Sequence, residues 1–272
     1  MHRFLTKVNH LVRKVYLFLA FVMLLCLGCE WHLRATDESG DEALVCIERY
    51  DRVEALYLTT GDYAALGQMN TSYPEQTRML IENILQLGKV DDPLINQKFL
   101  RFFQDSTLQM IIAEVERQYT DVDDINSNLS EAFEVLCKLI PSLEVPQVYT
   151  QIGSLDQSIV VGDGLLGISL DKYLGSDNQL YVKYEYSSDQ LRMMERAFIV
   201  PDCLGFYLLS LYPIPAECEW SLEERHRHMG RIQWVVNRAM RRKVFDNVYV
   251  AAADRLMNED ESMTVDLLLK HI

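Results

Sequence analysis

The 272-residue sequence lacks the motif His-Glu-x-x-His, which places two zinc ligands and a general base on one helix of many metal-dependent hydrolases. It also has only 12 glycines and 7 prolines, and it contains no internal repeat or low-complexity segment. Hydrophobic side chains make up 49% of the chain. This composition predicts a chain that folds over most of its length, and the missing motif excludes the commonest zinc-hydrolase helix.

Acidic side chains are absent from the start of the chain, where residues 1–14 hold four basic side chains. An apolar run of thirteen residues follows, Val15–Leu27, and the segment ends in Cys26-Leu-Gly-Cys29. This order is typical of a secretory signal, and thirteen residues are too few to span a bilayer comfortably. Leu-Gly-Cys resembles the lipobox of bacterial lipoproteins, which implies removal of residues 1–28 and acylation, for example by palmitate, of Cys29. Two alternatives stay open: an uncleaved membrane anchor, or an ordinary signal peptide in which Cys29 is incidental.

Basic side chains are scarce in the rest of the chain. Without residues 1–28, 22 basic and 40 acidic side chains remain, a formal charge of −18. So acidic a chain is expected to repel both phosphate backbones and anionic membranes, which excludes nucleic acid as an expected partner. The polar residues 29–42 are expected to form a flexible tether, and residues 43–272 a single globular domain.

Closely spaced cysteines are also lacking in the domain. Its four cysteines form no C-x-x-C pair, which excludes a zinc knuckle or a thioredoxin-type motif. They are Cys46, Cys137, Cys203 and Cys218. Export permits disulfides, but a free cysteine also packs well as a small apolar side chain. Whether Cys203 and Cys218 form a disulfide stays open.

The pattern of apolar residues predicts mostly helices. Helices are expected at Tyr73–Gly88, from Asp92-Pro93, from the cap Asp105 to Tyr119, from Asn128 to Ile140, from Ser188 or Asp189, over Pro201–Tyr212 and from Ser221 to Met240. A short strand is expected near Val45–Ile47, and others at Gln147–Ile152, Gln157–Val161 and Leu165–Leu170. Gly162-Asp163-Gly164 indicates a hairpin between the last two. The sequence therefore predicts an α+β fold, a mostly helical single domain with a small antiparallel sheet.

Several catalytic motifs fit only in part. Gly162–Ser169 has the glycine spacing of a phosphate-binding loop, but Ile168 occupies the position of the lysine. Gly167-Ile-Ser-Leu-Asp171 has an aspartate where a nucleophile elbow needs its second glycine. Asp121–Asp124 resembles the start of a calcium loop but lacks the later glycine and glutamate. We therefore expect no catalytic site.

A further charged segment, near residue 226, is a weak candidate for a metal site. His226 and His228 point in different directions on a helix, since they are two residues apart. Glu224 and His228 share one face and could pair or bind a metal weakly. We interpret the segment as an exposed helix start, with no metal and no cofactor expected.

One long stretch is more specific than these motifs. Its parts are Asp105-Ser106, Ala132-Phe133, Leu139–Pro141, Val145–Thr150, Ser158–Val161, Gly167–Asp177 and Ile199–Asp202, with Ile47–Asp51 as an opening strand. This stretch resembles the gliding-motility-associated lipoprotein B (GldB-like) family of Bacteroidetes, over about residues 45–240. The most specific part is Ile-Ser-Leu-Asp-x-Tyr-Leu-Gly at residues 168–175.

The resemblance implies a cell-envelope lipoprotein that faces the periplasm and is linked to gliding and to type IX secretion. It implies no enzymatic activity, partners among envelope proteins, and membrane attachment through the N-terminal lipid. The implied fold is similar to a degenerate zincin-like fold. A degenerate zinc-peptidase-like domain that binds a peptide or glycan in a cleft is the alternative function.

We call residues 168–175 the family-like block. This block and the aspartates around it supply the candidate site residues. They are Asp163, Asp171, Tyr173, Gly175, Asp177 and Asp202. We expect Asp171 to cap a short turn and Gly175 to supply a positive φ. The alternative, which stays open, is that the four aspartates line a cleft at the end of the sheet.

Overall fold

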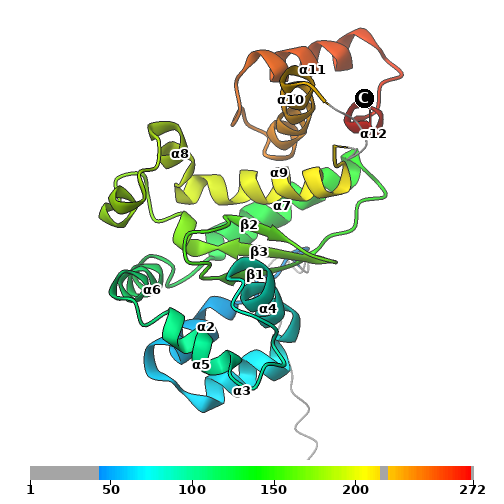
Figure 1. Cartoon of the computed structure of the whole chain (residues 1–272). Coiled ribbons are helices and arrows are strands. Elements are labelled where there is room, and N and C mark those ends of the chain that lie inside the picture. The colour runs from blue at the N-terminus through cyan, green and yellow to red at the C-terminus, as the bar shows by residue number, and fades with distance from the viewer. Residues whose placement is uncertain (1–42, 215–219, 271–272) are drawn as a thin grey trace, which may run out of the picture. The chain divides into compact units, whose positions relative to one another are not determined.

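The computed structural model describes residues 43–214 and 220–270, and the chain divides into two units, residues 1–42 and Ala43–Ile272. The predicted signal peptide, the acylated Cys29 and the tether lie outside the described residues. So does Cys218, whereas Cys203 is fully buried in a helix. The second unit has its own hydrophobic core (Figure 1).

The first half of this unit is helical. Its elements are α2 (Tyr50–Thr60), α3 (Tyr63–Ser72), α4 (Pro74–Arg78), the π-helical η1 (Met79–Ile84), α5 (Ile95–Phe102), α6 (Ser106–Gln118) and α7 (Asp123–Leu139). The expected cap of α6 is confirmed, because the carboxylate of Asp105 accepts hydrogen bonds from the amides of Thr107 and Leu108. The strand expected near Val45–Ile47 is reduced to one bridge, between Glu48 and Tyr149.

Helix α7 begins five residues before the expected start at Asn128. Ile125 lies one turn before Leu129 on the same buried face, so burial extends the helix towards its N-terminus. Asn128 therefore lies inside the helix, where its side-chain amide donates to the carbonyl of Asp124. The expected end at Ile140-Pro141 is confirmed.

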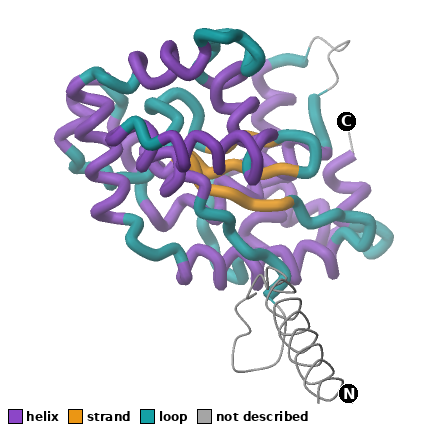
Figure 2. The backbone as a smooth tube through the Cα atoms, turned by 90° about the horizontal axis from the view of Figure 1, so that it is seen from below, coloured by secondary structure: helices purple, strands orange, loops and turns teal. Residues whose placement is uncertain are grey.

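The sheet contains β1 (Gln147–Gln151), β2 (Ile159–Val161) and β3 (Leu165–Ser169) in the order β1-β3-β2. The β2–β3 hairpin is confirmed, but the prediction of an antiparallel sheet was wrong, because β1 pairs with β3 in parallel. The chain reverses after β1 and again after β2, so β3 runs in the same direction as β1. It pairs with both of the other strands and therefore lies between them. The sheet is therefore mixed, and helices surround it (Figure 2).

The glycine at position 167 allows β3 to pack closely beside β1. Gly167 of β3 lies opposite Tyr149 of β1, and a Cβ at Gly167 would come within 2.6 Å of the Tyr149 ring. The ring packs edge-on against Tyr50 of α2, with 6.2 Å between the ring centroids. The missing side chain at 167 thus makes room for an aromatic contact that joins β1, β3 and α2.

The second half returns to helices after the sheet. Its elements are η2 (Leu170–Lys172), η3 (Gln179–Tyr184), α8 (Ser188–Met193), η4 (Arg196–Phe198), α9 (Ile199–Leu211), α10 (Leu222–Ala239), α11 (Val248–Glu259) and α12 (Val265–Lys270). Helix α9 packs on the sheet, and α10–α12 lie together beyond α9, on the side away from α2–α5 (Figure 1). The expected capping box of α10 is confirmed, since Ser221 and Glu224 bond each other's backbone amides.

The close packing of α10 on α11 predicts a sensitive position. An added Cβ at Gly230 would lie 2.3 Å from the Cβ of Tyr249, so one of the helices must move. We expect Gly230→Ala to lower the free energy of unfolding by about 1–3 kcal/mol, measured by urea denaturation. The control is Gly67→Ala in α3, where an added Cβ meets nothing within 4 Å and should stabilise by about 0.5–1 kcal/mol. Equal effects of the two substitutions would contradict this packing.

Candidate functional site

The family-like block occupies the end of β3 and the short helix η2. Asp171 is fully buried there. Its carboxylate accepts hydrogen bonds from the amides of Gly153 at 2.8 Å and Leu155 at 2.5 Å. Burial raises the pKa of Asp171, and these two bonds oppose that rise. The side chain thus ties η2 to the loop that follows β1.

That loop needs the support of Asp171. Ser154 and Leu155 have φ values of 54° and 65°, a left-handed conformation that costs a residue other than glycine about 1–3 kcal/mol. An added Cβ at Gly153 would lie 2.8 Å from the hydroxyl of Ser169, so the loop packs directly on β3. The Asp171 bonds and the burial of the Leu155 side chain offset the strain.

Two buried tyrosines bond the backbone of the same block. The Tyr181 hydroxyl donates to the carbonyl of Asp171 at 2.7 Å and accepts from the amide of Leu174 at 2.8 Å. The Tyr119 hydroxyl, at the end of α6, donates to the carbonyl of Tyr173 at 2.5 Å. These bonds satisfy backbone groups that would otherwise be buried without partners. The block therefore joins β3, α6 and the segment around η3.

Tyr173 connects the block to α9. Its hydroxyl donates to Oδ2 of Asp202 at 2.8 Å, and both side chains are buried. Burial raises the pKa of Asp202 to about 6, and the bond from Tyr173 opposes that rise. This carboxyl group titrates within the ordinary pH range of a cell compartment.

A small cavity opens over this pair, with a volume of about 170 Å³. Its lining residues are Ser158, Lys172, Tyr173, Tyr186, Gln190, Met193, Met194, Asp202 and Phe206. The ammonium of Lys172 lies 4.7 Å from the centre of the Tyr186 ring, in a cation–π contact. The cavity thus combines a carboxylate, an ammonium group and aromatic surface.

The other expected site residues do not line this cavity. Asp163 is exposed in the turn between β2 and β3. Gly175 has a φ of 102°, and its amide donates to the carbonyl of Met194. Asp177 is exposed and lines a separate hollow against α6. Of the six residues, only Tyr173 and Asp202 line the cavity, and Asp171 is fully buried in the core.

The segment around His226 has separate structural roles. Glu224 caps α10 through Ser221, while His228 is buried and its Nε2 lies 2.8 Å from the carbonyl of Tyr212. Burial lowers the pKa of His228. Within residues 43–214 and 220–270, no group of three His, Cys, Asp or Glu side chains is placed to hold a metal ion.

Several residues of this region have no sequence signal that would identify them. Lys172, Tyr186 and Phe206 come from separate elements and meet only in the folded chain. Glu54 of α2 is fully buried, and its carboxylate accepts from the amide of Ile152 beside the same loop. Burial raises the pKa of Glu54 well above its ordinary value. Glu54 lies on the same face of the helix as Tyr50 and Leu58, but a charged side chain is ordinarily assigned to the solvent side.

Comparison with known families identifies the chain. A family model described as gliding motility protein GldB matches residues 34–247, more than half of the sequence. The chain belongs to the GldB lipoprotein family. The match includes the whole family-like block and the residues that line the cavity. It supports a gliding-motility-associated lipoprotein of the cell envelope.

The other comparisons give no further relative of this GldB-family chain. Neither the curated proteins nor the solved structures contain a match. The likeness to a zincin-like fold, which the resemblance implied, is therefore unsupported. Among the helices of the described part of the chain, none has the length and apolar character needed to cross a membrane.

Asp202 predicts how the stability of this GldB-family domain depends on pH. Because its pKa is raised, the folded state holds a proton that the unfolded state has released between about pH 4 and pH 6. The protonated Asp202 carboxyl group makes its full contribution to the free energy of unfolding below pH 4, and this contribution is lost as pH rises through 6. We expect wild type to lose about 3 kcal/mol relative to Asp202→Asn between pH 4 and pH 7, in urea unfolding curves. Asp163→Asn is the control and should follow wild type; parallel curves for wild type and Asp202→Asn would refute the assignment.

Proposed function

We propose that this chain is a periplasm-facing lipoprotein, anchored through acylated Cys29, that serves protein–protein assembly in the gliding and type IX secretion apparatus without catalysis. The observation that carries the proposal is the family match over residues 34–247. The residues of the block support it, because Asp171 and the tyrosines around it bond the backbone of the domain itself. These buried side chains are therefore used to hold the fold together.

The size of the cavity favours a protein partner. Small-molecule sites usually measure about 300–1,000 Å³, and this cavity measures about 170 Å³. A space of that size suits one inserted side chain better than a whole substrate. Docking of a single side chain into a preformed cavity is typical of the centre of a protein interface.

The walls of the cavity define the kind of side chain. Met193 and Phe206 remain 44% and 43% exposed, large values for residues of this type. They form an apolar rim, whereas Asp202 and Tyr173 supply polar groups deeper in the cavity. We therefore propose that a partner inserts a side chain with an apolar stem and a polar end that bonds to the Asp202 carboxyl group.

The anchor would increase the occupancy of such a weak site. A single inserted side chain contributes little affinity by itself, because association carries a large entropic cost. Attachment to a membrane confines both partners to a thin layer, which raises their effective concentration. The anchor at Cys29 and the cavity thus act together.

Crosslinking in intact cells tests this proposal. A photoreactive amino acid replaces Phe206 in the full-length chain, and we expect a covalent adduct with a discrete envelope protein, identified by mass spectrometry. Combining this probe with Cys29→Ser should reduce the adduct about tenfold or more, because confinement is lost. The matched control is Cys46→Ser, which removes an exposed cysteine of the folded domain and should leave the adduct unchanged.

A second probe, placed far from the cavity, tests whether the adduct depends on the position of the photoreactive residue. Tyr63 in α3 is 86% exposed, so the same photoreactive residue there should give no discrete adduct. Absence of an adduct from position 206, or equal adducts from both positions, would contradict docking at the cavity. Persistence of the adduct in Cys29→Ser would show that the anchor only sets the location.

A further inference from the structure

The charge of the chain is unevenly distributed. The formal net charge is −14, yet every charged side chain from Arg225 to Lys243 is a cation, and there are seven of them. They are Arg225, Arg227, Arg231, Arg238, Arg241, Arg242 and Lys243. At physiological ionic strength the field of a charge decays over about 8 Å, so this segment acts locally as a basic surface.

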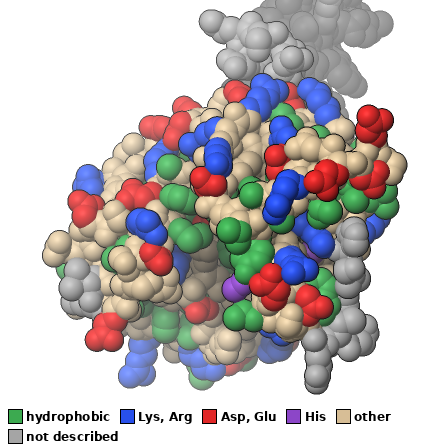
Figure 3. All heavy atoms as spheres, turned by 90° about the horizontal axis from the view of Figure 1, so that it is seen from above, with side chains coloured by type: hydrophobic (Ala, Val, Ile, Leu, Met, Phe, Trp, Pro, Cys, Tyr) green, Lys and Arg blue, Asp and Glu red, His purple; other side chains and the backbone are tan. Residues whose placement is uncertain are grey.

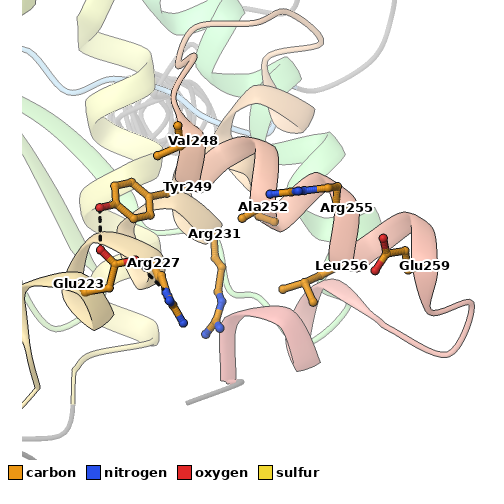
Figure 4. Close-up of a pocket in the computed structure, with 10 residues that line it drawn as sticks. Glu223, Arg227, Arg231, Val248, Tyr249, Ala252, Arg255, Leu256 and Glu259 are labelled. Atoms are coloured by element: carbon orange, nitrogen blue, oxygen red, sulfur yellow. Dashed lines mark hydrogen bonds and ion pairs between the residues drawn. The ribbon is translucent and has the colours of Figure 1, made fainter.

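The fold gathers six of these cations at two hollows between α10 and α11. One has a volume of about 470 Å³ and contains Arg227, Arg231 and Arg255 in its lining (Figure 4). The other, of about 620 Å³, contains Arg238, Arg241, Arg242 and Lys243. We call the seven cations that line the two hollows the basic surface; they include Arg255 of α11, whereas Arg225 lines neither hollow. The side of the molecule formed by α10–α12 shows basic and acidic side chains mixed with hydrophobic ones (Figure 3).

Acidic neighbours neutralise only part of this charge. Glu223 pairs with Arg227, Asp254 with Arg238 and Asp246 with Lys243, all of them exposed pairs, and Glu259 also lines the first hollow. Residues 221–259 still carry eight cations against five acids. Arg241 and Arg242 form no ion pair with a side chain of residues 43–214 or 220–270.

The first hollow shows that the cations are held close together. The guanidinium groups of Arg227 and Arg231 lie side by side (Figure 4). Burial lowers the pKa of Arg231, and the charge of Arg227 lowers it further. The charges in this hollow therefore act on one another, and the surface as a whole attracts anions.

Apolar side chains on the same helices distinguish between anionic partners. Val248 of α11 is 73% exposed and lines the first hollow beside Arg227 and Arg231, as does Leu256 of the same helix. Cations interspersed with exposed apolar side chains are typical of surfaces that lie on a bilayer, where headgroup phosphates meet the cations and the apolar groups enter the interface.

We propose that the basic surface binds the anionic phospholipid headgroups of the membrane that carries the protein. The inference uses the proposed anchor only to bring a bilayer within reach. Two weak attachments, one acyl-based and one electrostatic, give a firm and oriented association where either alone is reversible. This contact would hold α10 and α11 against the bilayer.

Vesicle binding by the isolated domain tests the proposal independently of the anchor. Residues 43–272 form a compact unit with its own core, so this fragment is suitable for co-sedimentation. We expect binding to vesicles of phosphatidylcholine mixed with phosphatidylglycerol, weakening as salt rises, and no binding to phosphatidylcholine alone. Each cation near an anionic surface contributes about fivefold in affinity, so Arg241→Glu/Arg242→Glu should weaken binding at least about 25-fold.

A matched double variant controls for net charge. Arg78→Glu/Arg101→Glu makes the same charge change on α4 and α5, at the other end of the unit (Figure 1), and should leave binding within about twofold of wild type. Equal loss in both variants, or no vesicle binding by wild type, would overturn the proposal. Binding to soluble polyglutamate without binding to vesicles would overturn it in favour of an acidic polypeptide. Neither result bears on the crosslink at position 206, so the two proposals fail separately.

Discussion

The hydrogen bonds from the amides of Gly153 and Leu155 to the buried carboxylate of Asp171 are the constraint on which the central part of this fold depends. They hold a strained loop against β3, and that loop allows the chain to reverse between β1 and β2. Without the reversal, β3 would not lie between the other two strands. The tyrosines around the block then connect it to α6 and α9. The residues of the family-like block are thus explained by their structural role, since they join the loop after β1, β3, α6 and α9.

Local signals in the sequence predicted most of the helices and the β2–β3 hairpin. Asp105 and Ser221 cap their helices through short-range bonds, and Gly162-Asp163-Gly164 encodes the turn by itself. The parallel pairing of β1 with β3 depends instead on contacts between distant residues, such as Tyr149 opposite Gly167. No local pattern contains that information.

The candidate site was predictable only in its central residues. Tyr173 and Asp202 stand in the family-like stretch, and both line the cavity. Phe206, Tyr186 and Lys172 lie there because α9, the segment between η3 and α8, and η2 converge, which is a property of the tertiary structure. The net charge of the chain likewise did not predict the basic surface. Salt screens distant charges, so the potential at α10 and α11 depends on the side chains nearby and not on the sum over the chain.

Amide hydrogen exchange at Gly153 and Leu155 tests most directly whether Asp171 holds the block together. If it does, these two loop amides exchange as slowly as the paired amides of β3, since they open only with the surrounding core. In Asp171→Ala they should lose this protection while the amides of α10, distant from the loop, retain theirs. Rapid exchange of both amides in the wild-type protein, at the rate of an exposed loop, would contradict the account.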